Sequence, residues 1–251
     1  MIPNMITLTA MAAGMTSVKF AIVSKWEEAV IAIVIAAFMD AFDGAAARLL
    51  KSQSKLGAEL DSLSDFICFG VAPAIVTFLW ATHDAGRLGW IMTLIFAMAV
   101  ALRLARFNVT KEEEPANDPL AKYFTGVPSP AGAGLAILPM IVSFQLDSKN
   151  PFEALALHYV QHPYSVGIWL VVLAAMMVSH IPTFSSKQIR VPQKMSVPAL
   201  GVFGILVAGL INEPWPTLTL MGVAYLFMIP FSVQHHRDKK ERLAQGVKDP
   251  D

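Results

Sequence analysis

Long apolar stretches alternate with short polar stretches along nearly the whole chain. An α-helix rises about 1.5 Å per residue, so about 20 apolar residues cross a hydrocarbon core roughly 30 Å thick. Stretches of suitable length occupy residues 5–23, 28–46, 60–82, 88–108, 128–146, 166–182, 195–212 and 215–234. The pattern predicts an all-α integral membrane protein, a polytopic helical bundle of about eight transmembrane helices. We expect one transmembrane domain over residues 1–234 and a polar tail over residues 235–251.

Composition supports this interpretation. The chain is 55% hydrophobic and 15% charged, with a mean hydropathy of +0.54, which exceeds what a soluble domain of 251 residues needs for its core. The single cysteine, Cys68, excludes an intrachain disulfide. The formal net charge is zero, and no nucleic-acid partner is expected.

Basic residues predict how the helices are oriented. The loops after the second, fourth and sixth spans, the adjoining helix ends and the tail hold 15 of the 19 Lys and Arg residues. The opposite loops hold only Lys25, Arg87 and Lys149. Because loops rich in Lys and Arg stay in the cytoplasm, both termini are expected there. Lys19 can extend from the first span to the lipid headgroups.

Four carboxylates lie in apolar surroundings at the predicted cytoplasmic side. Asp40 and Asp43 are three residues apart near the end of the second span, and Asp61 and Asp65 are four apart near the start of the third. Each pair therefore shares one face of its helix. The short polar stretch 49–56 favours a hairpin that sets the two faces opposite each other. Charged groups are costly near lipid, so this cluster points to a site that holds cations.

Four oxygen ligands suit hard divalent cations, Mg²⁺ or Mn²⁺, rather than zinc. We expect two such ions and phosphoryl-transfer chemistry. Gly44 and Gly57 leave the helix surfaces bare enough for a nucleotide to approach, and Arg48 can bind a diphosphate. Alternatively, the small residues serve helix packing and Arg48 marks the membrane boundary.

These residues form a signature. The chain resembles the CDP-alcohol phosphatidyltransferase family at all eight specified positions, which are Asp40, Asp43, Gly44, Ala47, Arg48, Gly57, Asp61 and Asp65. The resemblance implies that the four aspartates bind the metals and that Asp65 is the general base. It also implies that Asn4, Gly44, Ala47, Arg48 and Gly57 contact the CDP diphosphate, and that the protein is a homodimer.

Three further stretches resemble the phosphatidylserine synthase branch of this family. They are residues 61–74, 102–108 and 124–131. This resemblance implies that CDP-diacylglycerol and L-serine react to give phosphatidylserine and CMP. Arg106 and Asn108 are the expected serine-binding residues, while Arg103 could bind lipid phosphate.

Other readings remain open. A related synthase that uses glycerol 3-phosphate or choline would carry the same signature, since the signature defines the reaction class and not the alcohol. A cation transporter would also place carboxylates in the membrane, but it gives no reason for the spacing of Gly44, Ala47, Arg48 and Gly57. Beyond residue 150 the assignment of spans rests on hydropathy alone.

Overall fold

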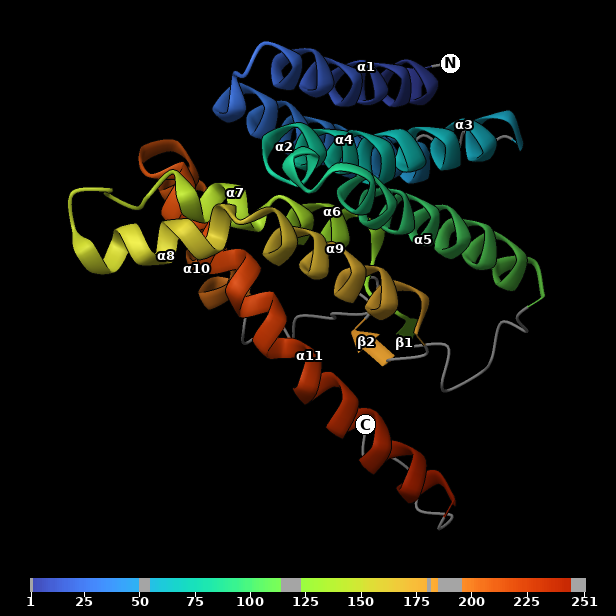
Figure 1. The fold of residues 1–251 in the computed structure, drawn as a ribbon. Helices are drawn as coiled ribbons and strands as arrows, with labels where there is room; N and C mark the ends of the chain where they lie inside the picture. Colours follow the sequence, from blue (N-terminus) through green and yellow to red (C-terminus); the bar gives the residue numbers. More distant parts are fainter. Residues whose placement is uncertain (1, 50–54, 114–122, 180–181, 185–195, 245–251) are drawn as a thin grey trace.

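The computed structural model describes residues 2–49, 55–113, 123–179, 182–184 and 196–244. The chain is almost entirely helical (Figure 1). Its elements are α1 (Ile2–Ile22), α2 (Trp26–Leu49), α3 (Lys55–Asp65), the π-helix η1 (Phe66–Val71), α4 (Ala72–Trp80), the 3₁₀-helix η2 (Thr82–Ala85), α5 (Gly86–Glu113), β1 (Tyr123–Thr125), α6 (Ser129–Ala136), α7 (Leu138–Ser143), α8 (Pro151–Gln161), α9 (Pro163–Val178), β2 (Pro182–Phe184), α10 (Ser196–Asn212) and α11 (Pro214–Ala244).

Each apolar stretch of the sequence coincides with helix. The first, second and fourth stretches are α1, α2 and α5, and the third is the continuous run from α3 through η1 to α4. Four helical segments are long and apolar enough to cross a membrane: 4–22, 56–80, 82–109 and 214–234. Counting the bent pair α8 and α9 as one span gives five. The protein is therefore a helical membrane protein, while the predicted number of eight spans is not confirmed.

The fifth predicted span is interrupted, and the sixth is preceded by an additional helix. The fifth consists of α6 and α7, separated at Ile137, and Pro139 follows at the second residue of α7. The sixth is preceded by α8, which bends by 58° into α9 at His162. The sequence pattern did not predict α8, a helix with no buried residue whose first turn is capped by the Asn150 side chain.

A small antiparallel ladder departs from the predicted all-α fold. β1 pairs with β2, with Phe124 opposite Thr183. Each strand has three residues, too short for a hydropathy pattern to reveal. The helix α11 continues without a break from the membrane segment to Ala244, so the first part of the expected polar tail is helical.

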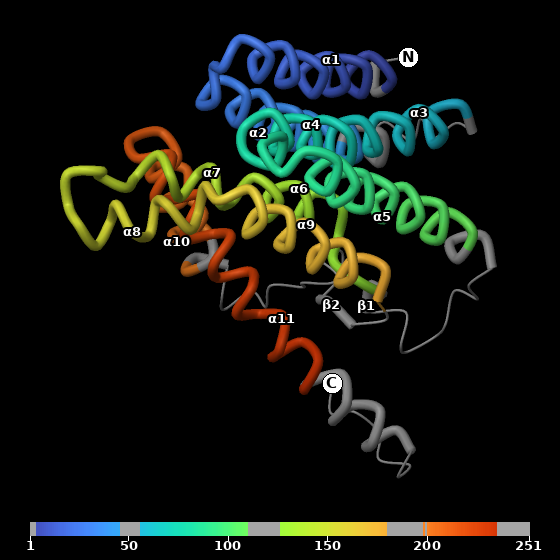
Figure 2. Tube along the Cα trace, viewed as in Figure 1, coloured from blue at the N-terminus to red at the C-terminus, as the bar shows by residue number. Residues whose placement is uncertain are grey.

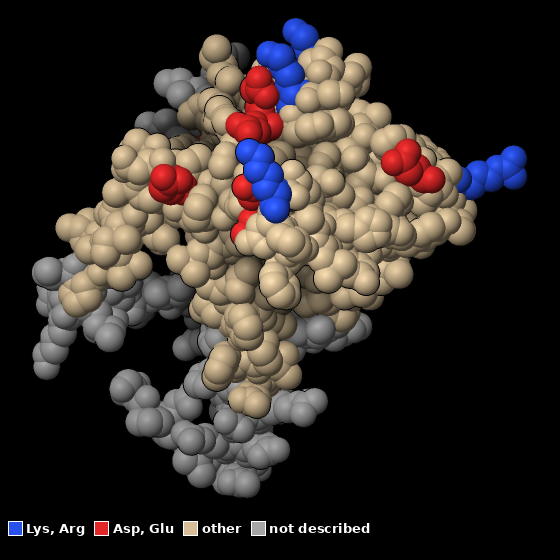
Figure 3. Space-filling view, turned by 60° about the vertical axis from the view of Figure 1, so that its left-hand side comes forward, with Lys and Arg blue, Asp and Glu red and all other residues tan. Residues whose placement is uncertain are grey.

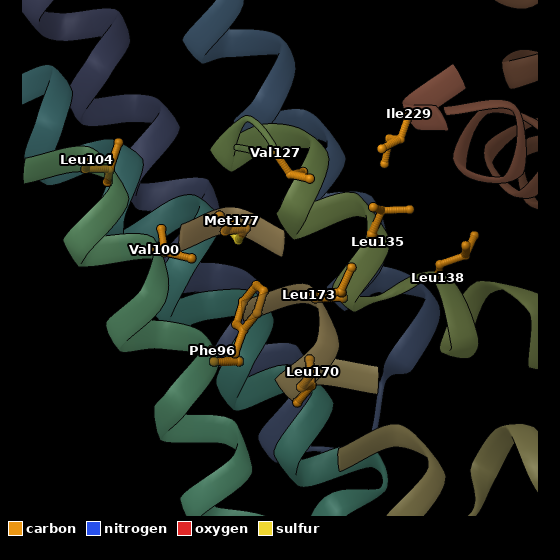
Figure 4. Packing of buried hydrophobic residues seen from close by; sticks show 12 residues of the cluster. Phe96, Val100, Leu104, Val127, Leu135, Leu138, Leu170, Leu173, Met177 and Ile229 are labelled. Atoms are coloured by element: carbon orange, nitrogen blue, oxygen red, sulfur yellow. The ribbon is translucent and has the colours of Figure 1, made fainter. Parts of the chain in front are cut away.

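The core lies between the central helices. Figure 4 shows Phe96 and Val100 of α5 facing Leu170 and Leu173 of α9, with Leu135 of α6 beside them. A second cluster joins α1, α2, α4 and α7. Side chains at these helix contacts are mostly aliphatic, with small residues such as Ala36 and Ala133 where backbones come close.

The outer surface is largely uncharged. On the face drawn in Figure 3, charged side chains form a few separate groups among many uncharged residues. Large apolar side chains are exposed along α10 and α11, including Ile205 at 73% and Phe227 at 68%. In water such a surface would be unfavourable, whereas lipid chains accommodate it.

Candidate active site

The site lies where α1, α2 and the third apolar segment meet. α1 packs along α2 and also contacts α3 and η1. The N-terminus of α1, the start of α3 and the end of α5 point toward the same side of the molecule (Figure 2). This is the side predicted to be cytoplasmic. Residues 50–54 of the expected hairpin lie outside the described residues.

Three of the four signature aspartates converge. Asp40 of α2 and Asp61 and Asp65 of α3 each offer a carboxylate oxygen, and these oxygens lie within 4.8 Å of one another. Asp61 is exposed, whereas Asp40 and Asp65 are half-buried. Three negative groups this close repel one another in a poorly hydrated setting, and a divalent cation between them would remove that cost.

Asp43 has a different environment. It lies one turn after Asp40 and is 5% exposed, and its carboxylate accepts a short hydrogen bond from the Thr7 hydroxyl of α1. Asp43 is therefore beside the cluster without belonging to the group of three. The Thr7 contact fixes α1 to the acidic face of α2.

The helix changes its winding directly after Asp65. Residues 66–71 form a π-helix, and such segments are frequent at functional sites because they redirect the neighbouring side chains. Two side chains, one on each side of Asp65, attach this part of the chain to α1. The Ser64 hydroxyl of α3 donates to the Thr7 carbonyl at 3.3 Å, and the Cys68 thiol of η1 donates to the Ala10 carbonyl at 3.3 Å. These contacts hold Asp65 in position relative to α1 and α2.

The structure describes the surroundings of only some of the residues that are expected to bind the nucleotide. Asn4 is half-buried on α1, one turn before Thr7 and so on the same face. Gly44 follows Asp43, and Gly57 lies one turn before Asp61; both are half-buried. Ala47 and Arg48 belong to α2, but their side chains lie outside the described residues.

The two expected serine-binding residues lie on the last part of α5. The Asn108 amide donates to the Ser62 hydroxyl at 2.9 Å, which connects α5 to the residue after Asp61. The Arg106 guanidinium donates to the Val178 carbonyl at the end of α9, at 3.5 Å. Asn108 is thus directly connected to the acidic helix, and Arg106 borders α9.

The sequence did not mark Arg103 as a partner of the acidic cluster. Its guanidinium interacts electrostatically with Asp65, and its Nη1 donates to the Ser129 hydroxyl at 2.6 Å. Arg103 and Ser129 both lie within the stretches that resemble phosphatidylserine synthase, so a signal existed for both. Thr7 lies three residues after Asn4, which the family resemblance marks. Tyr225 of α11 also interacts electrostatically with Arg103, and no motif marks it.

The donor set fits the expected metal. Its members are carboxylate oxygens, which Mg²⁺ and Mn²⁺ prefer, and no cysteine or histidine belongs to this described group. The Asp65 Oδ1 atom is buried without a hydrogen-bond partner. A buried carboxylate oxygen without a donor is costly, and coordination to a cation would satisfy it.

Such a carboxylate group in a helical membrane protein is suited to hold divalent cations. A family model described as CDP-alcohol phosphatidyltransferase matches residues 1–177, and a second, described as CDP-alcohol phosphatidyltransferase 2, matches residues 194–230. The chain belongs to the CDP-alcohol phosphatidyltransferase family, and it is an enzyme.

Several relatives carry a more specific name. The CDP-diacylglycerol–serine O-phosphatidyltransferase of Mycobacterium tuberculosis (strain H37Rv) is 30% identical over 236 residues, covering 94% of this chain and 79% of the relative. The protein of the same name from Helicobacter pylori (strain J99) is 32% identical over 203 residues, covering 79% and 78%. That from Methanocaldococcus jannaschii is 40% identical over 105 residues, covering 42% and 46%.

Proposed function

We propose that this enzyme transfers the phosphatidyl group of CDP-diacylglycerol to the hydroxyl of L-serine, giving phosphatidylserine and CMP. The observation that carries the proposal is the convergence of Asp40, Asp61 and Asp65 within a complete family signature. The relatives named CDP-diacylglycerol–serine O-phosphatidyltransferase support serine as the acceptor, since two of them align with most of the chain.

The aspartates have separate tasks in this proposal. Asp40, Asp43, Asp61 and Asp65 would hold two divalent cations, with Asp43 steadied by Thr7. Bound Mg²⁺ or Mn²⁺ supplies charge neutralisation for the diphosphate. Asp65 accepts the proton of the attacking serine hydroxyl as the new phosphorus–oxygen bond forms and the bond to CMP breaks. Its burial between helices keeps it close to the reacting atoms.

The remaining signature residues bind the nucleotide in this proposal. Gly44, Ala47 and Gly57 present small helix surfaces to CDP, and Arg48 and Asn4 contact its diphosphate. Asn108 and Arg106 bind the amino-acid portion of serine. The hydrogen bond from Asn108 to Ser62 supports this assignment, because it places Asn108 next to the acidic helix.

We propose eight spans within a catalytic domain of residues 1–234, with both termini and the active site on the cytoplasmic face of a bacterial inner membrane. The excess of Lys and Arg on that side supports the orientation. Two copies would form a homodimer, as the family resemblance implies. Mass measurement of the purified protein in nanodiscs tests the number of copies, and a mass of one chain per disc contradicts the dimer.

The acceptor assay tests the reaction directly. Purified protein is given CDP-diacylglycerol and Mg²⁺ or Mn²⁺, and CMP release is compared with serine, glycerol 3-phosphate, inositol and choline. We expect CMP release to depend on serine. Release with another alcohol alone would retain the family reaction and overturn serine as the acceptor. Ion flux without CMP release would instead favour a transporter.

A further inference from the structure

Three buried polar atoms in the described part of the chain have no hydrogen-bond partner. They are Asp65 Oδ1, Arg103 Nε and Tyr225 Oη. Buried polar groups are nearly always paired, because leaving one unpaired costs the free energy of its lost hydration. The three groups are also linked, because Arg103 interacts electrostatically with both Asp65 and Tyr225.

A hydrogen bond fixes one edge of the Arg103 guanidinium. Its Nη1 donates to the Ser129 hydroxyl at 2.6 Å, and Ser129 itself is fully buried at the first position of α6. The contact fixes one edge of the guanidinium against α6. The Nε edge remains without an acceptor, although an Nε–H is an obligate donor.

Tyr225 brings the last helix to the same place. Its ring packs against the apolar cluster that contains Val100 and Leu104 of α5, the helix that carries Arg103. Ile229, one turn further along α11, belongs to this cluster and lies opposite Leu135 and Leu138 in Figure 4. The ring therefore has apolar partners, while its hydroxyl has none.

We propose that Arg103 and Tyr225 form an anion-binding subsite next to Asp65, in which the Arg103 Nε–H and the Tyr225 hydroxyl donate to one anionic oxygen group of a substrate. The inference rests on the proposed function, which supplies two such groups. One is the carboxylate of the amino-acid acceptor, and the other is a phosphate of CDP-diacylglycerol. Both offer the oxygen acceptors that the two donors lack.

The subsite gives α11 a part in substrate binding. A carboxylate held by Arg103 would bring the hydroxyl of the same small amino acid toward Asp65, with which Arg103 interacts electrostatically. A phosphate held there would instead orient the lipid donor. In either case the C-terminal helix contributes directly to a site whose signature lies entirely in the N-terminal helices.

Tyr225→Phe tests the proposal, since it removes only the hydroxyl and keeps the packed ring. Serine and CDP-diacylglycerol are varied separately, and KM, kcat and thermal unfolding are measured in the same detergent. We expect one KM to rise about tenfold, which is the usual effect of losing a hydrogen bond to a charged group. Tm should not fall, because the hydroxyl has no protein partner to lose. Tyr164→Phe on the exposed start of α9 is the matched control.

The outcomes are distinguishable. A higher KM for serine supports the subsite with the carboxylate as its ligand, and a higher KM for CDP-diacylglycerol supports it with the phosphate. Unchanged values for both, or a lower Tm with no change in either KM, overturn it. Arg103→Lys keeps the charge but lacks the Nε–H edge, and it should raise the same KM as Tyr225→Phe. If wild-type protein uses another alcohol, serine fails as the acceptor, while the CDP-diacylglycerol measurement still decides the subsite.

Discussion

Two regions of the molecule consist of apolar helices: the region around the acidic cluster, and the hairpin of α10 and α11. They differ in how much of each is buried by the rest of the protein. Half of the apolar window in 56–80 is buried by other parts of the protein, against 11% of the window in 214–234. In the first region, the Ser64 side chain of α3 and the Cys68 side chain of η1 donate to backbone carbonyls of α1. In the second, large apolar side chains such as Ile211 and Phe231 face outward.

The difference teaches how helix packing supports chemistry in a membrane. Carboxylates can stay close together only where surrounding helices fix them and a cation can neutralise them. The acidic region has both a fixed backbone and a donor set for a metal. Among the described residues, no such donor set lies in the α10–α11 hairpin, and we expect the hairpin to tolerate change at its lipid-facing positions.

Removal of divalent metal should have the largest effect. Three carboxylates within 4.8 Å of one another cannot bind a diphosphate without cations between them. We expect CMP release to fall to background in excess EDTA and to return with Mg²⁺ or Mn²⁺. Addition of Ca²⁺ at the same concentration is the control for nonspecific ionic effects. Full activity in EDTA would contradict a metal site.

Asp65→Asn should reduce turnover by about 10³-fold, since general-base catalysis typically contributes about 10²–10⁴-fold. CDP-diacylglycerol binding should largely survive, because the base acts on the transition state more than on the ground state. Steady-state CMP release and binding of labelled CDP-diacylglycerol measure the two effects. Asp84→Asn, at an exposed aspartate in η2, is the matched control and should keep wild-type turnover. Turnover near wild type in Asp65→Asn would refute the role of this residue.

The sequence predicted this acidic region well for a physical reason. Helical periodicity places Asp61 and Asp65 on one face from spacing alone, and apolar neighbours make their charge conspicuous. It could not predict that Asp43 turns toward Thr7, because that contact joins residues 36 positions apart. The serine-binding role of Asn108 stays a prediction, and the hydrogen bond from Asn108 to Ser62 could not be foreseen because it depends on how α5 crosses α3.

The C-terminal region shows the opposite balance. Hydropathy located α10 and the start of α11 to within one residue, yet it gave no reason to single out Tyr225. A tyrosine in an apolar helix is common, and only the tertiary packing of α11, which contacts α6 and α7, brings Tyr225 within electrostatic range of Arg103. The bend between α8 and α9 was also missed, because the sequence suggested a loop before Pro163 where the structure has a helix.

Thr7→Val should destabilise the acidic region by about 1–3 kcal/mol, because the buried Asp43 carboxylate loses its donor. We expect a lower Tm together with a several-fold loss of CMP release. Thermal unfolding in detergent and the acceptor assay measure both. Thr9→Val lies on the exposed face of the same helix, where the Thr9 hydroxyl only returns to the Met5 carbonyl, and should change little. Equal effects of the two variants would contradict the proposed role of the Thr7–Asp43 contact.

A pair of glycine substitutions compares the two regions at the smallest scale. A Cβ added to Gly14 of α1 would lie 2.9 Å from Cys68 Sγ and 3.2 Å from Cys68 Cα, so α1 would have to move away from η1. We expect Gly14→Ala to cost about 1–3 kcal/mol of stability, the usual range for overpacking.

Gly204 of α10 has no atom within 4 Å of an added Cβ. Gly204→Ala should leave stability unchanged or raise it by up to about 1 kcal/mol, since alanine favours the helix over glycine. Thermal unfolding and CMP release in matched preparations measure both variants. A loss of stability at Gly204 as large as that at Gly14 would mean that α10 packs against a further surface, in which case the contrast between a fixed acidic region and a lipid-facing hairpin fails.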